Sequence, residues 1–306
     1  ETAIKVYVLG LAGITGRMQW GLLDRCTNYG AINVKGIAVD SWAKTVNGKT
    51  YTNWAAQIAK TTNSLAYFSV GGIFAFVQHN IATAATFTEL TNAADIYVEC
   101  EQEGTITYAD NAGVSVGGIT GRTGANAYNP HFEGCTNMGN ITLKSNVASA
   151  EAFVGGICGH FAGNQNKSPY IPYCQGSSNN GTISFVTDNP ESVIAHAGGI
   201  CGAAIYGHVS ICVNAGSVNN ASTNAASTAG SILGCRHRST ITPTSVQTVA
   251  FTLNGNGAGG SVNGTALTAG NYLQYIYGGF EGGYEPTFAT NADGTNSNTF
   301  FTLGGN

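Results

Sequence analysis

The sequence predicts an all-β fold, namely a parallel β-helix (β-solenoid) with irregular loops and a C-terminal β region rich in aromatic residues and glycine. Three observations predict it. Two short motifs alternate along most of the chain, and the apolar segments are too short for helices. These segments are also rich in Ile, Val and Thr, and Gly and Asn bound them.

The first motif is a glycine pair followed by isoleucine, and in two of its copies Ala or Ser replaces one of the two glycines. Its six copies are "LAGITG" at 11, "VGGIFA" at 70, "VGGITG" at 116, "VGGICG" at 154, "AGGICG" at 197 and "AGSILG" at 229. Glycine accepts the backbone bend at a corner, and the isoleucine that follows is expected to point into the core. The isoleucines predicted to stack on one another are Ile14, Ile73, Ile119, Ile157 and Ile200, with Ile232 close by.

The second motif follows most copies of the first and contains an Asn-x-Gly turn. It reads "CTNYGAI" from Cys26, "CTNMGNI" from Cys135 and "CVNAGSV" from Cys212, with a degraded copy from Leu90 and a stretched copy from Cys174. Asn and Gly both tolerate positive φ, which is typical of turns between strands.

The steps between copies of the first motif are unequal: 59, 46, 38, 43 and 32 residues. Unequal steps around a repeated pattern indicate stacked units of constant core with loops of varying length. We expect solenoid repeats over residues 1–245 and a C-terminal β cap or small β region over 246–306. A short helix with Asn53 as its N-cap is expected inside the longest step, over residues 53–66.

Eight cysteines are present, an even number that invites disulfides in a secreted chain. Their motif positions favour buried thiols. Cys158 and Cys201 share a position that other copies fill with Thr, Phe or Leu, and Cys26, Cys135, Cys174 and Cys212 share a position with Leu90. Sites that accept such residues are apolar, where a thiol packs as a small hydrophobe. One or two disulfides stay open as an alternative. The sequence contains no C-x-x-C, so it does not support a metal site built from cysteines.

The composition excludes several classes of protein. Charged residues make up 9%, the net charge is −4 and no basic run occurs, so nucleic acid is not an expected partner. No apolar stretch approaches the ~20 residues that span a bilayer, so this chain is not expected to insert into a membrane. The chain begins with Glu1, and we expect it to be processed from a longer precursor.

The two-part pattern over roughly residues 1 to 240 resembles the GLUG-type repeats of secreted and surface-anchored proteins from Bacteroides-like bacteria. The pieces that carry the resemblance are "VGGI-x-G" and "C-x-N-x-G-x-[IV]". It implies an extracellular β-solenoid at the bacterial cell surface, often in adhesins or surface lipoproteins. The family implies no catalytic residues.

One acidic stretch is a candidate for chemistry. "VECEQEG" places Glu99, Glu101 and Glu103 on one strand face, since side chains alternate along a strand. Three such carboxylates suit Ca²⁺ binding or a polysaccharide lyase. A solvated polar strand face is the favoured alternative.

Basic residues recur at another position. Arg17, Arg122 and His160 each follow the motif isoleucine by three residues, so they are expected to form a line on one surface. Such a line suits an acidic glycan, although Phe76 and Ala203 interrupt it, and polar residues at the solvent edge of each coil are the favoured interpretation.

Aromatic residues gather near the C-terminus, at Tyr272, Tyr275, Tyr277, Phe280 and Tyr284. Tyrosines in glycine-rich loops can stack on sugars or on partner proteins. They can equally cover the open end of the solenoid, which we favour because an exposed β end needs cover.

We therefore expect a non-enzymatic extracellular structural or adhesive protein that presents loops on a rigid β-solenoid and assembles end to end. Its expected partners are other copies of itself, surface proteins, or host and dietary glycans. A glycan-binding module and a polysaccharide-active lyase or hydrolase are the alternatives. No cofactor is expected, with Ca²⁺ left open.

Overall fold

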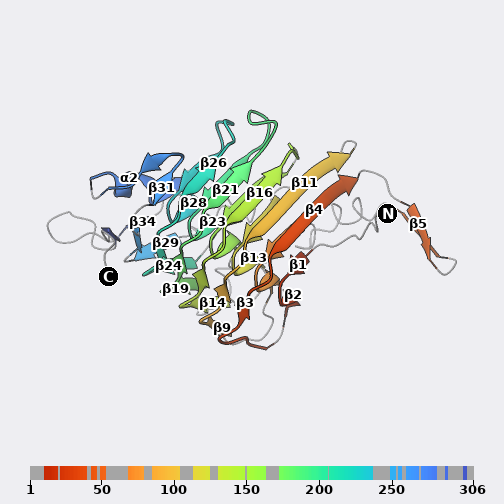
Figure 1. The fold of residues 1–306 in the computed structure, drawn as a ribbon, viewed down its shortest axis with the longest axis horizontal. Coiled ribbons are helices and arrows are strands. Elements are labelled where there is room, and N and C mark those ends of the chain that lie inside the picture. Colours follow the sequence, from red (N-terminus) through yellow and green to blue (C-terminus); the bar gives the residue numbers. More distant parts are fainter. Residues whose placement is uncertain are drawn as a thin grey trace, which may run out of the picture.

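The computed structural model describes residues 10–19, 21–39, 43–46, 49–52, 68–78, 85–103, 113–124, 130–148, 150–162, 172–205, 207–236, 249–252, 254–256, 260–268, 270–280, 287–288 and 299–301. Five sheets of stacked strands run along one axis (Figure 1). We name them A to E in the order in which the chain passes through them, so the five strands given below for each of the second to sixth coils belong to sheets A, B, C, D and E in turn. The four strands given for the first coil before its hairpin belong to sheets A, B, D and E. The predicted all-β parallel β-helix is confirmed. The helix expected over 53–66 lies outside the described residues.

The strands of the first three coils are as follows. The first coil holds β1 (Gly10–Ala12), β2 (Thr15–Met18), β3 (Thr27–Asn28) and β4 (Ile32–Val39), followed by the antiparallel hairpin β5 (Ala43–Val46) and β6 (Lys49–Thr52). The second holds β7 (Phe68–Gly71), β8 (Phe74–Val77), β9 (Ala85–Thr88), β10 (Thr91–Asn92) and β11 (Ile96–Glu103). The third holds β12 (Gly113–Gly117), β13 (Thr120–Thr123), β14 (Pro130–Glu133), β15 (Thr136–Asn137) and β16 (Ile141–Ser145).

The later coils repeat this order. The fourth holds β17 (Glu151–Gly155), β18 (Cys158–Phe161), β19 (Tyr173–Gln175), β20 (Ser178–Asn179) and β21 (Ile183–Val186). The fifth holds β22 (Ala195–Gly198), β23 (Cys201–Ala204), β24 (Gly207–Ser210), β25 (Val213–Asn214) and β26 (Val218–Asn220). The sixth holds β27 (Thr228–Gly230), β28 (Leu233–Arg236), β29 (Val249–Thr252), β30 (Asn254–Asn256) and β31 (Ser261–Val262), and the chain ends with β32 (Thr265–Ala266), α2 (Tyr272–Tyr275), β33 (Tyr277–Phe280), β34 (Thr287–Phe288) and β35 (Thr299–Phe301).

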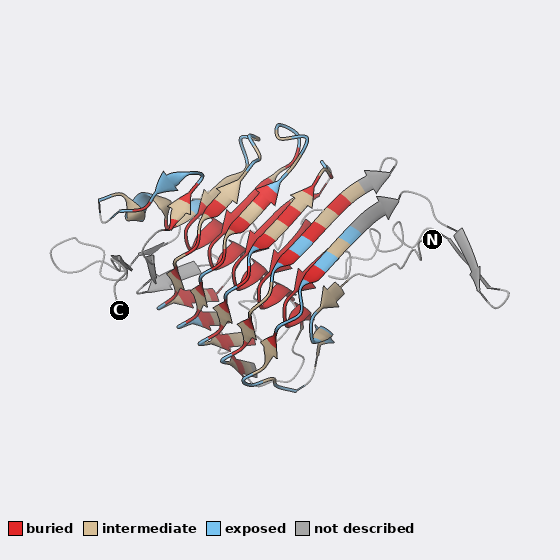
Figure 2. Ribbon diagram, in the orientation of Figure 1, coloured by how far each residue is buried: buried red, intermediate tan, exposed pale blue. Residues whose placement is uncertain are grey.

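Each step of the glycine-isoleucine motif is one complete coil, since every coil from the second to the sixth adds one strand to each sheet. Motif residues stand in register from coil to coil. The N–H of each motif isoleucine from Ile73 onward donates to the carbonyl of the next one, with N···O distances of 2.9 to 3.1 Å. Along sheet E, buried positions alternate with half-buried or exposed ones (Figure 2).

The isoleucines Ile73, Ile119, Ile157, Ile200 and Ile232 are fully buried. Ile14 departs from the expected burial, with 44% of its surface exposed. The reason is its place in the first coil, where described residues stack on one side only.

The coils continue past residue 245, although the motifs fade there. β29, β30 and β31 extend sheets C, D and E, and β33 extends sheet B. The N–H of Ile232 donates to the carbonyl of Ile276 at 3.0 Å, so Ile276 is a further layer of the isoleucine ladder. Its surroundings read "QYIYGG" rather than "GGI-x-G", which hides the equivalence in the sequence.

The two motifs meet inside each coil. The Asn of the second motif lies against the second glycine of the first, and a Cβ on Gly118 would stand 2.6 Å from Oδ1 of Asn137 and 2.1 Å from the carbonyl oxygen of Gly156. Only glycine permits this approach. The same contact recurs in the neighbouring coils, where Gly72 faces Asn92, Gly156 faces Asn179 and Gly199 faces Asn214.

The asparagines form a continuous ladder. Each Nδ2 donates to the carbonyl two residues ahead, and that of the first four members also donates to Oδ1 of the Asn in the next coil, with Asn-to-Asn distances of 2.7 to 2.9 Å. The members are Asn28, Asn92, Asn137, Asn179 and Asn214, and all except Asn28 are 0% exposed. A buried amide is tolerated when its hydrogen bonds are satisfied, as they are here.

The Gly–Asn contact divides the interior into two apolar clusters. Residues between the glycine pair and the Asn, such as Ile119 and Phe132, belong to one cluster lined by sheets B, C and D. Residues outside that interval, such as Val116 and Leu143, belong to the other, between sheets A and E.

Three corners of the coil have constant length. Two residues join sheet A to sheet B in every coil, two join C to D from the second to the fifth coil, and three join D to E from the first to the fifth. The B-to-C corner varies from two residues (205–206) to twelve (237–248), and the E-to-A corner from five (146–150) to 28 (40–67). Through the fifth coil, length therefore varies at the B-to-C and E-to-A corners alone.

The register of one cysteine departs from the expectation. Thr136 pairs with Ser178, so Ser177 and not Cys174 is equivalent to Cys135. Cys174 pairs with Phe132 and therefore takes an aromatic position of sheet C. All eight cysteines are thiols, and seven of them are buried.

The C-to-D corner begins with a residue at positive φ in every one of the first five coils: Arg25, Glu89, Gly134, Gly176 and Ile211. Ile211, at φ 56°, is the least suited, because a β-branched residue in this region is strained by about 1–2 kcal/mol. Gly134, at φ 61°, carries no such strain.

We expect Ile211→Gly to stabilise the protein by about 0.5–1 kcal/mol, since the relieved strain exceeds the added entropy of the unfolded chain. Gly134→Ile is the matched control and should destabilise by a similar amount, because a Cβ there meets nothing closer than 3.7 Å and only the backbone changes. Urea unfolding of both variants measures this. A destabilised Ile211→Gly would contradict the strain argument.

Candidate functional site

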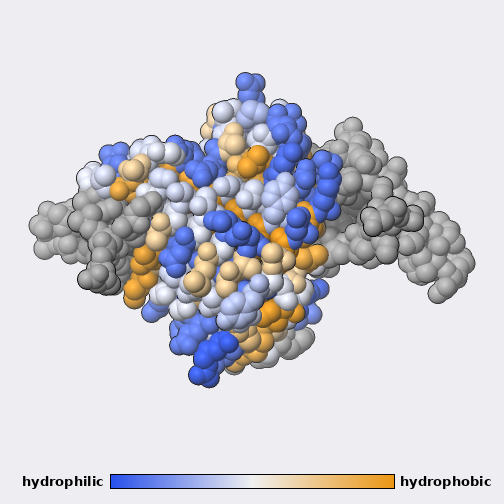
Figure 3. Space-filling model, in the orientation of Figure 1, coloured by the Kyte–Doolittle hydropathy of each residue, from blue (hydrophilic) through white to orange (hydrophobic). Residues whose placement is uncertain are grey.

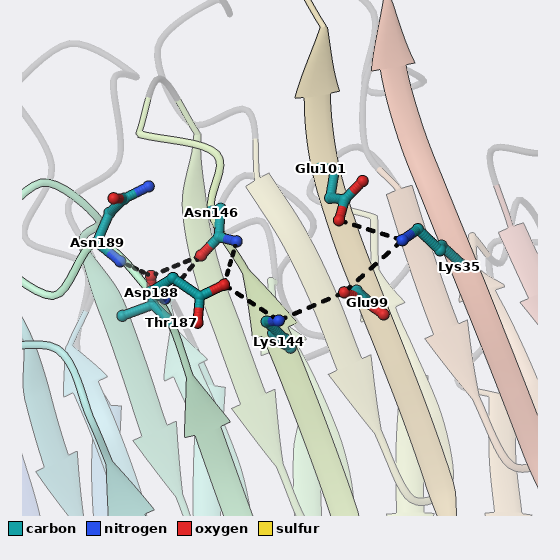
Figure 4. A network of polar contacts seen from close by, with 8 residues as sticks. All are labelled: Lys35, Glu99, Glu101, Lys144, Asn146, Thr187, Asp188 and Asn189. Atoms are coloured by element: carbon teal, nitrogen blue, oxygen red, sulfur yellow. Dashed lines mark hydrogen bonds and ion pairs between the residues drawn. The ribbon is translucent and has the colours of Figure 1, made fainter.

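The most extensive charged network lies on the outer face of sheet E (Figure 4). Lys35 on β4, Glu99 on β11 and Lys144 on β16 are register partners on adjacent strands. Glu99 Oε1 stands 3.9 Å from Nζ of Lys35 and 3.5 Å from Nζ of Lys144. Glu101 Oε1 lies 3.1 Å from Lys35, and Asp188 Oδ2 lies 3.1 Å from Lys144.

Strand alternation builds this face. Val98 and Cys100 point into the core, so Glu99 and Glu101 point outward on the same strand. Parallel pairing in register then places a carboxylate between two ammonium groups, which is the favourable order of charge across strands.

A turn after β21 completes the network. Asn146 Nδ2 donates to Asp188 Oδ2 at 2.9 Å, and the backbone N–H of Asp188 donates to Asn146 Oδ1 at 2.8 Å. The bond from Asn146, together with Lys144, lowers the pKa of Asp188 below its usual value. The hydrogen bond to Glu101 raises the pKa of Lys35, and the bond to Asp188 raises that of Lys144.

This geometry favours an ion-paired strand face over a calcium site. Glu99 and Glu101 already contact ammonium groups, whereas a Ca²⁺ site needs oxygen ligands whose charge is not compensated. Glu103 ends β11, and its side chain lies outside the described part of the molecule. Across the described ranges, no three His, Cys, Asp or Glu side chains are arranged to hold a metal ion.

The C-terminal tyrosines lie against the last layers of the core. Tyr272 and Tyr277 pack on the cluster lined by sheets B, C and D, and Tyr275 packs on the cluster between sheets A and E. The backbone of Phe280 pairs with Arg236, but the Phe280 side chain and Tyr284 lie outside the described residues. The three described tyrosines are half-buried, as residues that cover an end would be.

The line of Arg17, Arg122 and His160 is in register, but the prediction that it lies on a surface is wrong. Arg122 is 3% exposed and His160 is 0% exposed. Only Arg17 is exposed, where its Nη2 donates to Gln78 at 2.5 Å and its guanidinium lies over the ring of Phe76.

Burial of this line follows from the close approach of sheets A and B, which the sequence did not reveal. A Cβ on Gly121 would stand 2.7 Å from the backbone N of Val70, so the two sheets face each other. Phe153 stacks between His160 and His196, with ring centroids 4.6 and 5.6 Å apart. Alternation within each strand predicts that these polar side chains face solvent, and only the second sheet turns that face into an interior.

The outer face of sheet C carries a second cluster that the sequence pattern did not predict. His131, Tyr173 and His208 are register partners on adjacent strands, and the rings of His131 and Tyr173 stack with centroids 3.7 Å apart. The Tyr173 hydroxyl donates to Glu133. Burial, with help from Glu133, raises the pKa of Tyr173 to about 12, and burial lowers that of His208.

Apolar residues on the face seen in Figure 3 gather in separate groups between hydrophilic ones. Among the described residues, no helix has both the length and the apolar character needed to cross a membrane.

The chain matches no protein-family model, no curated protein and no solved structure. The resemblance to GLUG-type repeats therefore stays a prediction from the motifs.

We expect the sheet E network to behave as surface ion pairs. Glu99→Gln should lower stability only slightly, with the difference shrinking in high salt, and millimolar CaCl₂ should leave the thermal midpoint unchanged relative to MgCl₂ at equal ionic strength. Differential scanning fluorimetry measures both. A thermal midpoint that rises with CaCl₂ in the wild type but not in Glu99→Gln would contradict this expectation and support Ca²⁺ binding at Glu99.

Proposed function

We propose that this chain is a non-enzymatic structural or adhesive protein of the extracellular space or bacterial cell surface, which presents loops on a rigid β-solenoid. The observation that carries the proposal is the contrast between corners. From the second to the fifth coil three corners keep a constant length, whereas the other two corners vary from two to 28 residues along the chain. A scaffold with a constant core and connecting loops of variable length is suited to presenting those loops to partners, because long surface loops lower stability only slightly.

The internal ladders support rigidity. Satisfied Asn-to-Asn bonds link the first five coils side chain to side chain, in addition to the backbone bonds of five sheets. Such quasi-one-dimensional stacking holds loops of one corner in a row along the axis. The extracellular location rests on the motif resemblance alone.

End-to-end assembly is part of the proposal, and the first coil supports it. Among the strands that the structure describes, β1, β2, β3 and β4 each lie at the end of a sheet, and Ile14 beside them is 44% exposed. At the other end, β32 runs antiparallel to β31, which interrupts the parallel pattern of sheet E. Sedimentation over a range of protein concentrations measures the association. A protein that stays monomeric at every concentration would contradict end-to-end assembly.

A glycan-binding module is the second candidate, and the sheet C cluster favours it. His131, Tyr173, Glu133 and Gln175 offer half-buried or exposed ring edges, a carboxylate and an amide on adjacent strands. Sugar sites combine such groups.

Loop trimming tests the main proposal. Replacing 237–248 or 163–171 with two residues shortens these corners to two and four residues, against two at 205–206, and should leave the urea midpoint nearly unchanged. Adhesion of protein-coated beads to mucin and to bacterial cells should fall several-fold, because the presented loops are removed.

Three outcomes would contradict the proposal. Adhesion that survives both trimmed variants places the contact elsewhere, and adhesion lost in Tyr173→Ala on a glycan array favours the glycan module. Release of unsaturated sugar ends from an acidic polysaccharide would identify a lyase.

A further inference from the structure

Five cysteines lie together in the apolar cluster lined by sheets B, C and D: Cys135, Cys158, Cys174, Cys201 and Cys212. Each is at most 1% exposed. Within this group, Cys174 contacts both Cys201 and Cys212 through its sulfur. Cys174 therefore has two thiol neighbours in this cluster.

The register of the fourth coil produces this contact. Cys174 stands where the two preceding coils carry Phe87 and Phe132, so a small thiol replaces a phenyl ring. Cys212 of the fifth coil follows directly on the same corner, where the fourth coil carries Ser177. The Sγ atoms of Cys174 and Cys212 are 4.0 Å apart, and Cys212 Sγ lies 3.3 Å from the carbonyl oxygen of Cys174.

We propose that Cys174 and Cys212 form a disulfide site that links the fourth and fifth coils. A disulfide needs an S–S distance of about 2.05 Å, so the two sulfurs must approach by roughly 2 Å, which rotation about their Cα–Cβ bonds can supply. Cys174 lies on the sheet C strand of the fourth coil and Cys212 in the C-to-D corner of the fifth, so the bond would link neighbouring layers of the stack.

The oxidant in this proposal is a small-molecule disulfide such as oxidised glutathione. The thiolate of Cys212 attacks it, forming a mixed disulfide and releasing one glutathione thiolate. The thiolate of Cys174 then attacks the Cys212 sulfur and releases the second. Two protein thiols are oxidised, two glutathione thiols are formed, and the two thiol protons pass to solvent or to the released thiolates.

Burial decides when this exchange takes place. Both thiols are 0% exposed, and burial raises the pKa of Cys212 well above its ordinary value, so the folded thiol is neutral and shielded. The bond therefore forms while the fourth and fifth coils are still open. The site lies inside the core, so it does not depend on the proposed function.

Peptide mapping of the wild type tests the site. The protein is refolded over a range of glutathione redox ratios, quenched in acid, blocked with N-ethylmaleimide and digested with chymotrypsin. Cleavage after Phe185 and Tyr206 separates Cys174, Cys201 and Cys212 into three fragments. We expect the fragment of Cys174 linked to that of Cys212. A link from Cys174 to Cys201, or full blocking at every ratio, would overturn the proposal.

A stability measurement adds a second readout. The link closes a loop of 38 residues, so oxidation should lower the unfolding equilibrium constant by roughly 10²- to 10³-fold. Cys201→Ala should keep this difference, and Cys212→Ala should lose it. Loss of the difference in Cys201→Ala but not in Cys212→Ala would assign the bond to Cys201 instead. The wild-type map stands even where a variant does not fold.

Discussion

The close contact between a glycine and a buried asparagine in each coil is the constraint on which the rest of this structure depends. The glycine has no Cβ, so the bend between sheets A and B can reach the asparagine on the opposite side of the coil. The asparagine in turn satisfies its amide along the axis, from Asn28 to Asn214. This contact separates the interior of the coils into two apolar clusters and explains why the second motif follows most copies of the first.

The sequence predicted the fold because each motif residue has a defined structural role: glycine at bends, isoleucine in the core, and Asn with Gly at turns. Gly-Gly-Ile and Asn-x-Gly predicted stacked coils, and the coils are present. The ladder through Ile276 could not be predicted, since its coil keeps the isoleucine but not the glycine pair before it. The alignment of Cys174 with Cys135 was wrong, because strand register and not residue identity decides equivalence, and Ser177 takes that place.

The candidate sites were harder to predict than the fold. Alternation correctly placed Glu99 and Glu101 on one outer face, but their lysine partners come from strands more than 40 residues away in sequence. Alternation also predicted that Arg122 and His160 face solvent. They are buried, because sheet A faces sheet B on that side. Under the proposed function, recognition belongs to the two corners of variable length, since the other three keep a constant length from the second to the fifth coil.

The most direct test of the central constraint is the free energy of unfolding of Asn137→Ala. Asn137 donates to Gly139 and Asn179 and accepts from Asn92, so its loss leaves buried groups unsatisfied and should cost about 3 kcal/mol or more. Asn140→Ala, an exposed neighbour whose Oδ1 accepts from the backbone of Thr182, should cost less than about 1 kcal/mol. Equal losses in the two variants would contradict the claim that the asparagine ladder organises the coil.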